Sequence, residues 1–128
     1  MHLLHRTFVP LLLALLALLA TTAFAHGDWP AKHGGIMNDG GETSFELVVV
    51  RGRATLYVED HGTAVPTQGA RGTFTVTRGT AARSVDLKAA GSNRLETVQM
   101  IDMTKGDKAM ARVTLGNGSV VVGRFLVR

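Results

Sequence analysis

Apolar residues recur at every second position along much of the chain, which is the period of a half-buried β-strand rather than of a helix. Phe45, Leu47 and Val49, for example, alternate with residues that we expect to face outward. The same pattern repeats between glycine-containing turns. It predicts seven strands: Ser44–Val50, Ala54–Glu59, Gly72–Arg78, Arg83–Lys88, Arg94–Ile101, Ala109–Leu115 and Val120–Val127.

The connections between these strands are short, and no segment shows the 3.6-residue period of a helix. Gly116-Asn117-Gly118 is a strong signal for a tight hairpin turn. Short strands joined by such turns are typical of antiparallel all-β folds. We therefore expect an antiparallel β-sandwich or a small barrel of about seven strands over residues 44–128, preceded by a Gly-rich N-terminal arm over residues 26–43.

Residues 1–25 have the features of a secretory signal peptide. Arg6 precedes the apolar run Phe8–Ala20, and Ala23-Phe24-Ala25 supplies the small residues that signal peptidase recognises. The run is shorter than the roughly 20 residues that span a bilayer, and no second apolar run follows it. We expect cleavage after Ala25, export to the periplasm, and no membrane span in the processed chain.

Composition narrows the chemistry further. The formal charge of +4 falls to +3 when Arg6 is removed with the signal, and the basic residues are scattered among few aromatic ones. Scattered basic residues with few aromatic neighbours do not indicate a nucleic-acid-binding surface. The chain has no cysteine, so disulfides, thiolate metal sites and cysteine nucleophiles are excluded. No hydrolase, phosphate-loop or zinc-protease motif is present, and we expect a binding protein rather than an enzyme.

Histidine provides the candidate chemistry. Three histidines follow the expected cleavage point: His26, His33 and His61. Cleavage after Ala25 makes His26 the first residue, whose free amine and imidazole can chelate one metal ion once the amine loses its proton. One more imidazole, from His33 or His61, completes the three-nitrogen site called a histidine brace. Cu(II) binds nitrogen more tightly than the other divalent first-row ions, so copper is the expected metal.

Cleavage after Ala23 is the alternative. It leaves Phe24-Ala25-His26 at the front, with histidine in third place. The amine, two backbone amides and the third-residue imidazole then form a square-planar site for Cu(II) or Ni(II). Either cleavage produces a terminus that can bind copper.

Three further side chains belong to the predicted metal site. Asp60 is adjacent to His61, and Asp28 lies in the arm. Each is expected either to supply a weak axial oxygen or to orient an imidazole by a hydrogen bond to the ring nitrogen that does not bind the metal. Met37, four residues after His33, is the best additional ligand, because thioether sulfur suits Cu(I). Met100 and Met110 are expected to fill gaps in the core.

The strand signatures resemble those of a known group of proteins. They comprise His33-Gly34-Gly35, Phe45–Val49, Leu56–Asp60, Gly91–Leu95 and Arg124-Phe125. In these segments the chain is similar to small periplasmic proteins that accompany heavy-metal efflux systems, and to accessory segments of the adaptor subunits of those pumps. Its N-terminal histidine also resembles that of the periplasmic copper-binding sandwich proteins of copper resistance. Those proteins have an Asp-x-His pair, whereas Asp60 and His61 follow each other directly.

The sequence thus predicts a periplasmic copper-binding protein for heavy-metal resistance or trafficking, whose partner is a component of an efflux system. A competing interpretation is a metal-free module. In that case the exposed sheet edges pair with an efflux adaptor or another envelope protein, and the histidines are incidental.

Overall fold

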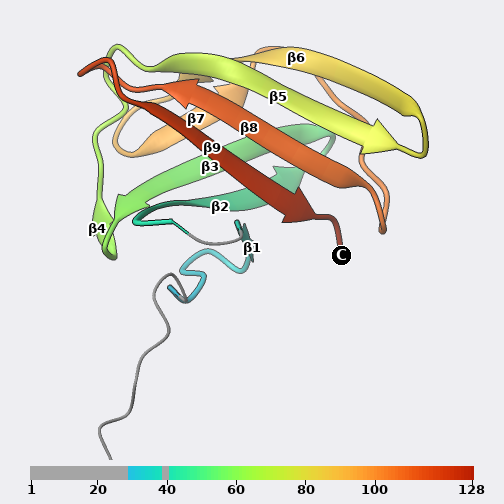
Figure 1. Ribbon diagram of the computed structural model, residues 1–128, viewed down its shortest axis with the longest axis horizontal. Helices are drawn as coiled ribbons and strands as arrows, with labels where there is room; N and C mark the ends of the chain where they lie inside the picture. Colours follow the sequence, from blue (N-terminus) through green and yellow to red (C-terminus); the bar gives the residue numbers. More distant parts are fainter. Residues whose placement is uncertain (1–28, 39–40) are drawn as a thin grey trace, which may run out of the picture.

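The computed structural model describes residues 29–38 and 41–128 (Figure 1). The described residues form nine strands and no helix. The strands are β1 (Ile36–Met37), β2 (Thr43–Val50), β3 (Arg53–Asp60), β4 (Thr63–Ala64), β5 (Arg71–Arg78), β6 (Ala81–Ala89), β7 (Arg94–Thr97), β8 (Lys108–Thr114) and β9 (Val120–Leu126). They pair in the order β1-β2-β3-β7-β6-β5-β8-β9, with β4 added to β3, and every pairing is antiparallel.

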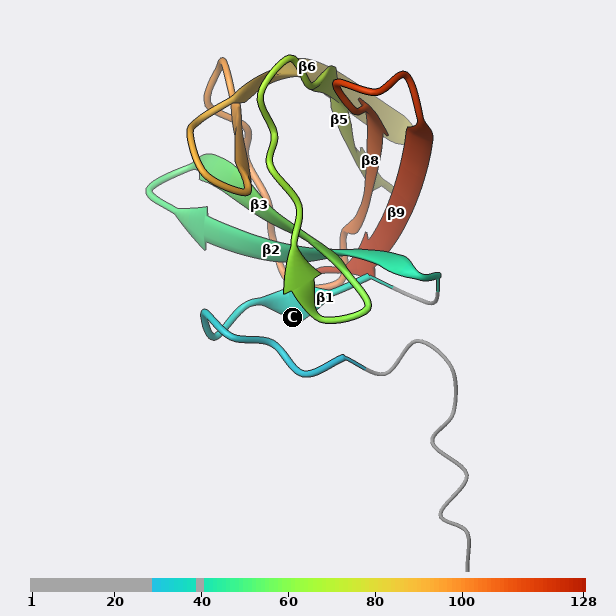
Figure 2. The same ribbon diagram turned by 90° about the vertical axis from the view of Figure 1, so that its left-hand side faces the viewer.

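The sheet curls until its two ends approach each other, because β9 contacts both β1 and β2. Viewed along the strands, the molecule is a nearly closed barrel with β2 and β3 on one side and β5 and β8 on the other (Figure 2). The all-β prediction is confirmed. The turn at Gly116-Asn117-Gly118 connects β8 to β9, and Gly118 N donates to Leu115 O at 2.9 Å.

Six of the seven predicted strands agree with the observed ones to within two residues at each end. The exception is Arg94–Ile101, because β7 ends at Thr97 and the chain then leaves the sheet. Ile101 N donates to Gly52 O at 2.8 Å, and its side chain turns into the core from an irregular segment. Because Ile101 is buried at an even spacing from Leu95 and Thr97, the sequence pattern indicates a longer strand than the one that forms. Met100 is 61% exposed, and Met110 is a half-buried residue at an outward position of β8, so the prediction that these two methionines fill the core is wrong.

Two strands have no counterpart in the prediction. β1 and β4 contain two residues each, which is too short for an alternating pattern to be recognised. β1 extends the sheet beyond β2, and β4 forms a hairpin with β3. The expected arm thus contributes β1 to the sheet, and Thr43 is the first residue of β2.

The inward-facing positions of the strands form one core. Its largest fully buried apolar side chains are Phe45, Phe74, Leu47, Leu56, Leu95, Ile101, Val58 and Val113. At the seam between β9 and β2, a Cβ on Gly123 would lie 2.5 Å from Cδ2 of Phe45 and 3.3 Å from Cβ of Asn38. Glycine at this position therefore lets the two ends of the sheet approach closely.

An ion pair holds the irregular segment that follows β7. Arg78 donates from Nε and Nη2 to the two carboxylate oxygens of Asp107, at 2.9 and 2.7 Å. Thr104 N donates to the same buried carboxylate at 2.8 Å. The bonds from Arg78 and then that from Thr104 lower the pKa of Asp107 to about 2. The carboxylate thus ties the segment to the end of β5.

Within the part of the chain that the structure describes, no helix is long and apolar enough to cross a membrane. The expected signal peptide, His26 and Asp28 lie outside the described residues.

Replacing Gly123 by Ala tests the packing at the seam. In an ordinary strand, alanine is more stable than glycine by about 0.5–1 kcal/mol. Here the added methyl group overlaps the ring of Phe45, so we expect the free energy of unfolding to fall by about 1–3 kcal/mol in urea denaturation. Ala82→Val, which adds carbon atoms at an exposed position of β6, should change it by less than about 0.5 kcal/mol. Wild-type stability in G123A would mean that the seam is loosely packed.

Candidate functional site

The arm crosses the outer face of β2 and β3 (Figure 2). On this face the register pairs Ser44 with Glu59 and Glu46 with Tyr57. These positions alternate with the core positions, so the sequence pattern places them in solvent. Glu46 and Glu59 are nevertheless only 4% and 7% exposed. The arm therefore buries two carboxylates on the outside of the barrel.

Glu46 is the centre of this interface. Its two oxygens accept hydrogen bonds from the backbone N–H groups of Lys32, His33 and Gly35, at 2.8, 2.7 and 2.9 Å. Nδ1 of His33 forms a fourth bond at 3.0 Å. Burial alone would raise the pKa of Glu46, but these hydrogen bonds outweigh it and hold the pKa below its usual range. Ionised Glu46 thus fixes the path of the arm.

The two glycines after His33 let the backbone reach Glu46. Gly34 has a φ of +69°, a left-handed conformation that glycine adopts without strain. Gly35 lies so close to β2 that a Cβ there would overlap the carbonyl oxygen of Leu47 and come within 2.9 Å of Cγ of Glu46. The His33-Gly34-Gly35 motif therefore has a structural role in docking the arm.

His33 makes two contacts with the sheet. Its imidazole stacks on the ring of Tyr57, with centroids 3.6 Å apart and planes 7° from parallel. Its Nδ1 bonds Glu46, and no hydrogen bond to Nε2 is found within the described residues. Met37 is in register with Glu46 and therefore projects from the same face of the sheet. His33 is thus held on the sheet by a carboxylate and by an aromatic ring.

Lys32 extends the interface toward the β3–β4 turn. Its Nζ lies 2.8 Å from Oε1 of Glu59 and donates to Gly62 O at 2.9 Å. Oε2 of Glu59 and Oγ of Ser44, its cross-strand neighbour, are buried with no hydrogen-bond partner among the described residues. One lysine and one histidine thus face two buried carboxylates.

His61 occupies the turn after β3. Its Nδ1 lies 2.7 Å from Oδ1 of Asp60, its Nε2 lies 4.0 Å from Oε1 of Glu42, and the side chain is 61% exposed. Trp29 approaches the imidazole edge-on, with ring centroids 6.4 Å apart. A Cβ on Gly62 would lie 3.1 Å from the same indole. The first described residue of the arm is therefore beside His61.

The structure brings some of the sequence-predicted residues together and separates others. Asp60 and His61 are in contact. His33 instead stacks on Tyr57, which precedes His61 by four residues and lies within β3. Over residues 29–38 and 41–128, no group of three or more histidine or carboxylate side chains has the arrangement of a metal site. The described residues therefore hold two separate histidine positions.

Sequence reasoning missed the residues that dock the arm. Glu46, Tyr57 and Glu59 occupy outward strand positions, and such positions are usually solvated. Lys32 and Trp29 lie in a segment without periodicity. One signal was available: the single tryptophan of the chain stands in a Gly-rich arm, and so large a ring is usually buried against something.

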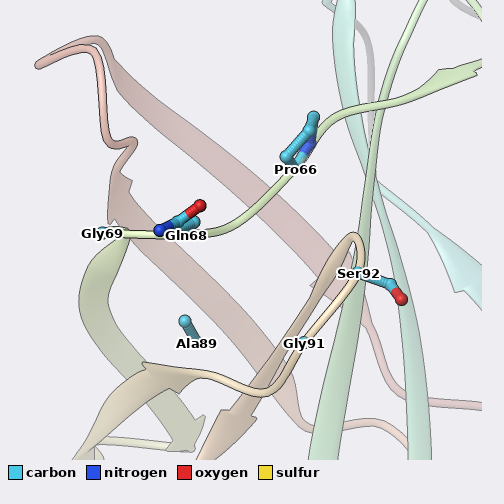
Figure 3. A pocket seen from close by; sticks show the side chains of 6 residues that line it. All are labelled: Pro66, Gln68, Gly69, Ala89, Gly91 and Ser92. Atoms are coloured by element: carbon cyan, nitrogen blue, oxygen red, sulfur yellow. The ribbon is translucent and has the colours of Figure 1, made fainter.

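A hollow at one end of the barrel is a weaker candidate (Figure 3). Its volume is about 480 Å³, and it lies between the segment that leads into β5 and the β6–β7 turn. It is lined by Pro66, Gln68, Gly69, Ala89, Gly91 and Ser92. None of these side chains carries a charge or a strong metal ligand, so the arm interface is the better candidate.

Neither a model of a known protein family, nor a curated protein, nor a solved structure matches the chain. The resemblance to proteins of metal efflux therefore stays an expectation.

Replacing Gly35 by Ala tests whether this residue docks the arm. Because the methyl group overlaps β2, we expect the arm to detach and the emission of Trp29, the single tryptophan, to shift to longer wavelength. The far-ultraviolet circular dichroism of the barrel should be retained. Gly34→Asn is the matched control, because asparagine tolerates the left-handed conformation and nothing lies within 4 Å of a Cβ there. Equal emission spectra for G35A and G34N would contradict this docking mode.

The ionisation of Glu46 predicts a dependence on pH. Its pKa is lowered in the docked state, so the stabilisation of docking is complete above the ordinary value of 4.5 and is lost as the pH falls through the lowered pKa. Emission of Trp29 should therefore report arm release below pH 4.5.

Glu46→Gln removes the charge and one acceptor oxygen, so the arm of this variant should already be detached at pH 7. Asp86→Asn, at an exposed position of β6, should leave the pH profile unchanged. A wild-type profile in E46Q would show that another group controls docking.

Proposed function

We propose that this protein is exported and binds a Cu(II) ion where its N-terminal arm meets the β3–β4 turn, in the service of metal resistance or trafficking. The observation that carries the proposal is the position of Trp29 beside His61. It brings the start of the arm to a histidine that a carboxylate already orients.

The Asp60–His61 pair supports metal binding by its chemistry. A histidine that binds a metal commonly donates its other ring N–H to a carboxylate, which fixes the ring and makes the ligating nitrogen more basic. Asp60 lies 2.7 Å from Nδ1 of His61, so the neutral imidazole carries its proton there and presents the lone pair of Nε2. In this proposal Asp60 orients the ligand and does not itself bind the ion.

Chain length allows His26 to complete the site. His26 lies outside the described residues, but it precedes Trp29 by three residues, which span at most about 11 Å. After cleavage behind Ala25, its amine and imidazole are thus within reach of Nε2 of His61. These three nitrogens suit the tetragonal geometry that Cu(II) prefers.

We assign His33 to docking rather than to ligation. Its Nδ1 bonds Glu46 and its ring stacks on Tyr57, so it fixes the arm that carries Trp29 toward His61. Met37 is in register with Glu46, away from the β3–β4 turn, and is not part of the proposed ligand set.

The proposed activity is binding rather than turnover. A periplasmic protein that holds one copper ion at an exposed turn can pass it to another protein, and the receiver we propose is a component of a heavy-metal efflux system.

The test is a Cu(II) titration of processed protein whose N terminus is verified by mass spectrometry, followed by electron paramagnetic resonance. We expect one ion per chain with nitrogen hyperfine structure. His61→Ala and an extra residue before His26 should each weaken binding at least tenfold, and Asp60→Asn about tenfold. His33→Ala is the control. It keeps the backbone bonds to Glu46 and removes only docking contacts, so it should leave the nitrogen hyperfine structure of the bound ion unchanged, whereas His61→Ala should alter it.

Binding that tolerates both His61→Ala and the extra N-terminal residue would contradict the proposal. The metal-free interaction module would then be the better interpretation.

A further inference from the structure

The face of the barrel formed by β5, β8 and β9 gathers basic residues from all three strands. The outward positions of β5, β8 and β9 carry four exposed cations: Arg71, Lys108, Arg112 and Arg124. Arg124 lies opposite Met110, and therefore diagonally between Lys108 and Arg112. Arg71 is diagonal to Arg112 through the pairing of Arg71 with Thr114. Diagonal neighbours are about 7–8 Å apart, so the cations form a zigzag across the face.

Few carboxylates lie near these charges. β8 and β9 contain no aspartate or glutamate. The carboxylate nearest in register is Asp86 on β6, which is a diagonal neighbour of Arg71 but lies two strands from Arg112. None of the four cations forms an ion pair with any described residue. By contrast, Arg78, at the end of β5, is held by Asp107. The zigzag therefore presents positive charge to the solvent.

Apolar side chains stand among the cations. Val120 and Leu126 on β9 are 51% and 54% exposed, and Met110 lies between Lys108 and Arg112 on β8. A shallow groove of about 450 Å³ crosses this region. Its lining includes Thr75, Thr77, Lys108, Met110, Arg124 and Leu126. The face thus combines positive charge with exposed aliphatic groups.

We propose that this face, the β5–β8–β9 face, docks on the surface of a lipid bilayer that contains acidic phospholipids. The cations bind lipid phosphates, and Leu126, Val120 and Met110 enter the boundary between headgroups and acyl chains. A single-stranded nucleic acid fits less well, because the outward positions hold no aromatic side chain on which bases can stack.

The distribution of charge orients the docked protein. Glu46, Glu59 and Asp60 lie with the arm on β2 and β3, across the barrel from β5 and β8 (Figure 2). An acidic membrane surface attracts the exposed cations of β5, β8 and β9 more strongly than the side where carboxylates accompany the basic residues of the arm. The candidate copper site therefore faces away from the bilayer, although docking itself does not depend on metal binding.

The test measures cosedimentation of the processed protein with vesicles of phosphatidylglycerol and phosphatidylcholine, and with vesicles of phosphatidylcholine alone. We expect binding to the acidic vesicles only, weakening as salt is added. Each Lys or Arg near such a surface strengthens binding about fivefold. The double variant Arg112→Glu and Arg124→Glu should therefore bind at least about 25-fold more weakly.

Two further variants separate lipid docking from general charge attraction. Arg51→Asp with Arg53→Glu reverses the same number of charges at the β2–β3 turn, outside the face, and should change binding by less than about fivefold. Leu126→Ser retains every charge and should weaken binding several-fold, because its apolar side chain no longer enters the bilayer. Circular dichroism checks that each variant is folded.

Three results would overturn the proposal: no binding to acidic vesicles at low salt, equal losses in the two double variants, or indifference to Leu126→Ser. If the protein binds dextran sulfate as tightly as acidic vesicles, and Leu126→Ser leaves this binding unchanged, the partner is a soluble acidic polymer instead.

Discussion

The buried carboxylate of Glu46 is the interaction on which the candidate site depends. A charged group removed from water must be neutralised or hydrogen-bonded, and three backbone N–H groups and one imidazole nitrogen of the arm do this for Glu46. Those bonds fix the arm from Lys32 to Gly35. Lys32 then reaches Glu59 and Gly62, and the chain before it brings Trp29 to His61. A single outward-facing side chain of β2 thus determines where the start of the arm lies.

The barrel separates two kinds of surface. The side formed by β2 and β3 carries buried carboxylates under the arm, together with an exposed histidine held by Asp60. The side formed by β5, β8 and β9 carries cations that lack partners within the described residues, mixed with apolar groups. A curled sheet keeps these surfaces apart, because the core between them is filled by the inward side chains of every strand. The copper site and the membrane-docking face that we propose therefore lie on different parts of the barrel surface.

The strands could be predicted because their signal is local. Side chains alternate between the two faces of a strand, so burial of Phe45 and Leu47 on one side is visible in a short window of sequence. The same rule failed at Ile101, which is buried from an irregular segment whose end is held by Arg78 and Asp107. The alternation rule could not find β1 and β4, because a strand of two residues is too short to show an alternating pattern.

By itself, the sequence determined the all-β fold and most strand positions, because these follow from the alternation of neighbouring residues and from glycine at turns. It also identified the histidines as candidate ligands, and Asp60 as a candidate either for a weak axial ligand or for a group that orients an imidazole. Only the tertiary structure decided that Glu46 is buried, that His33 docks the arm on Tyr57, and that cations from residue 71 to residue 124 share one face. The reason is physical: these contacts depend on strand order, on register and on the path of the arm, and residues distant in the sequence meet only when the sheet has formed and curled.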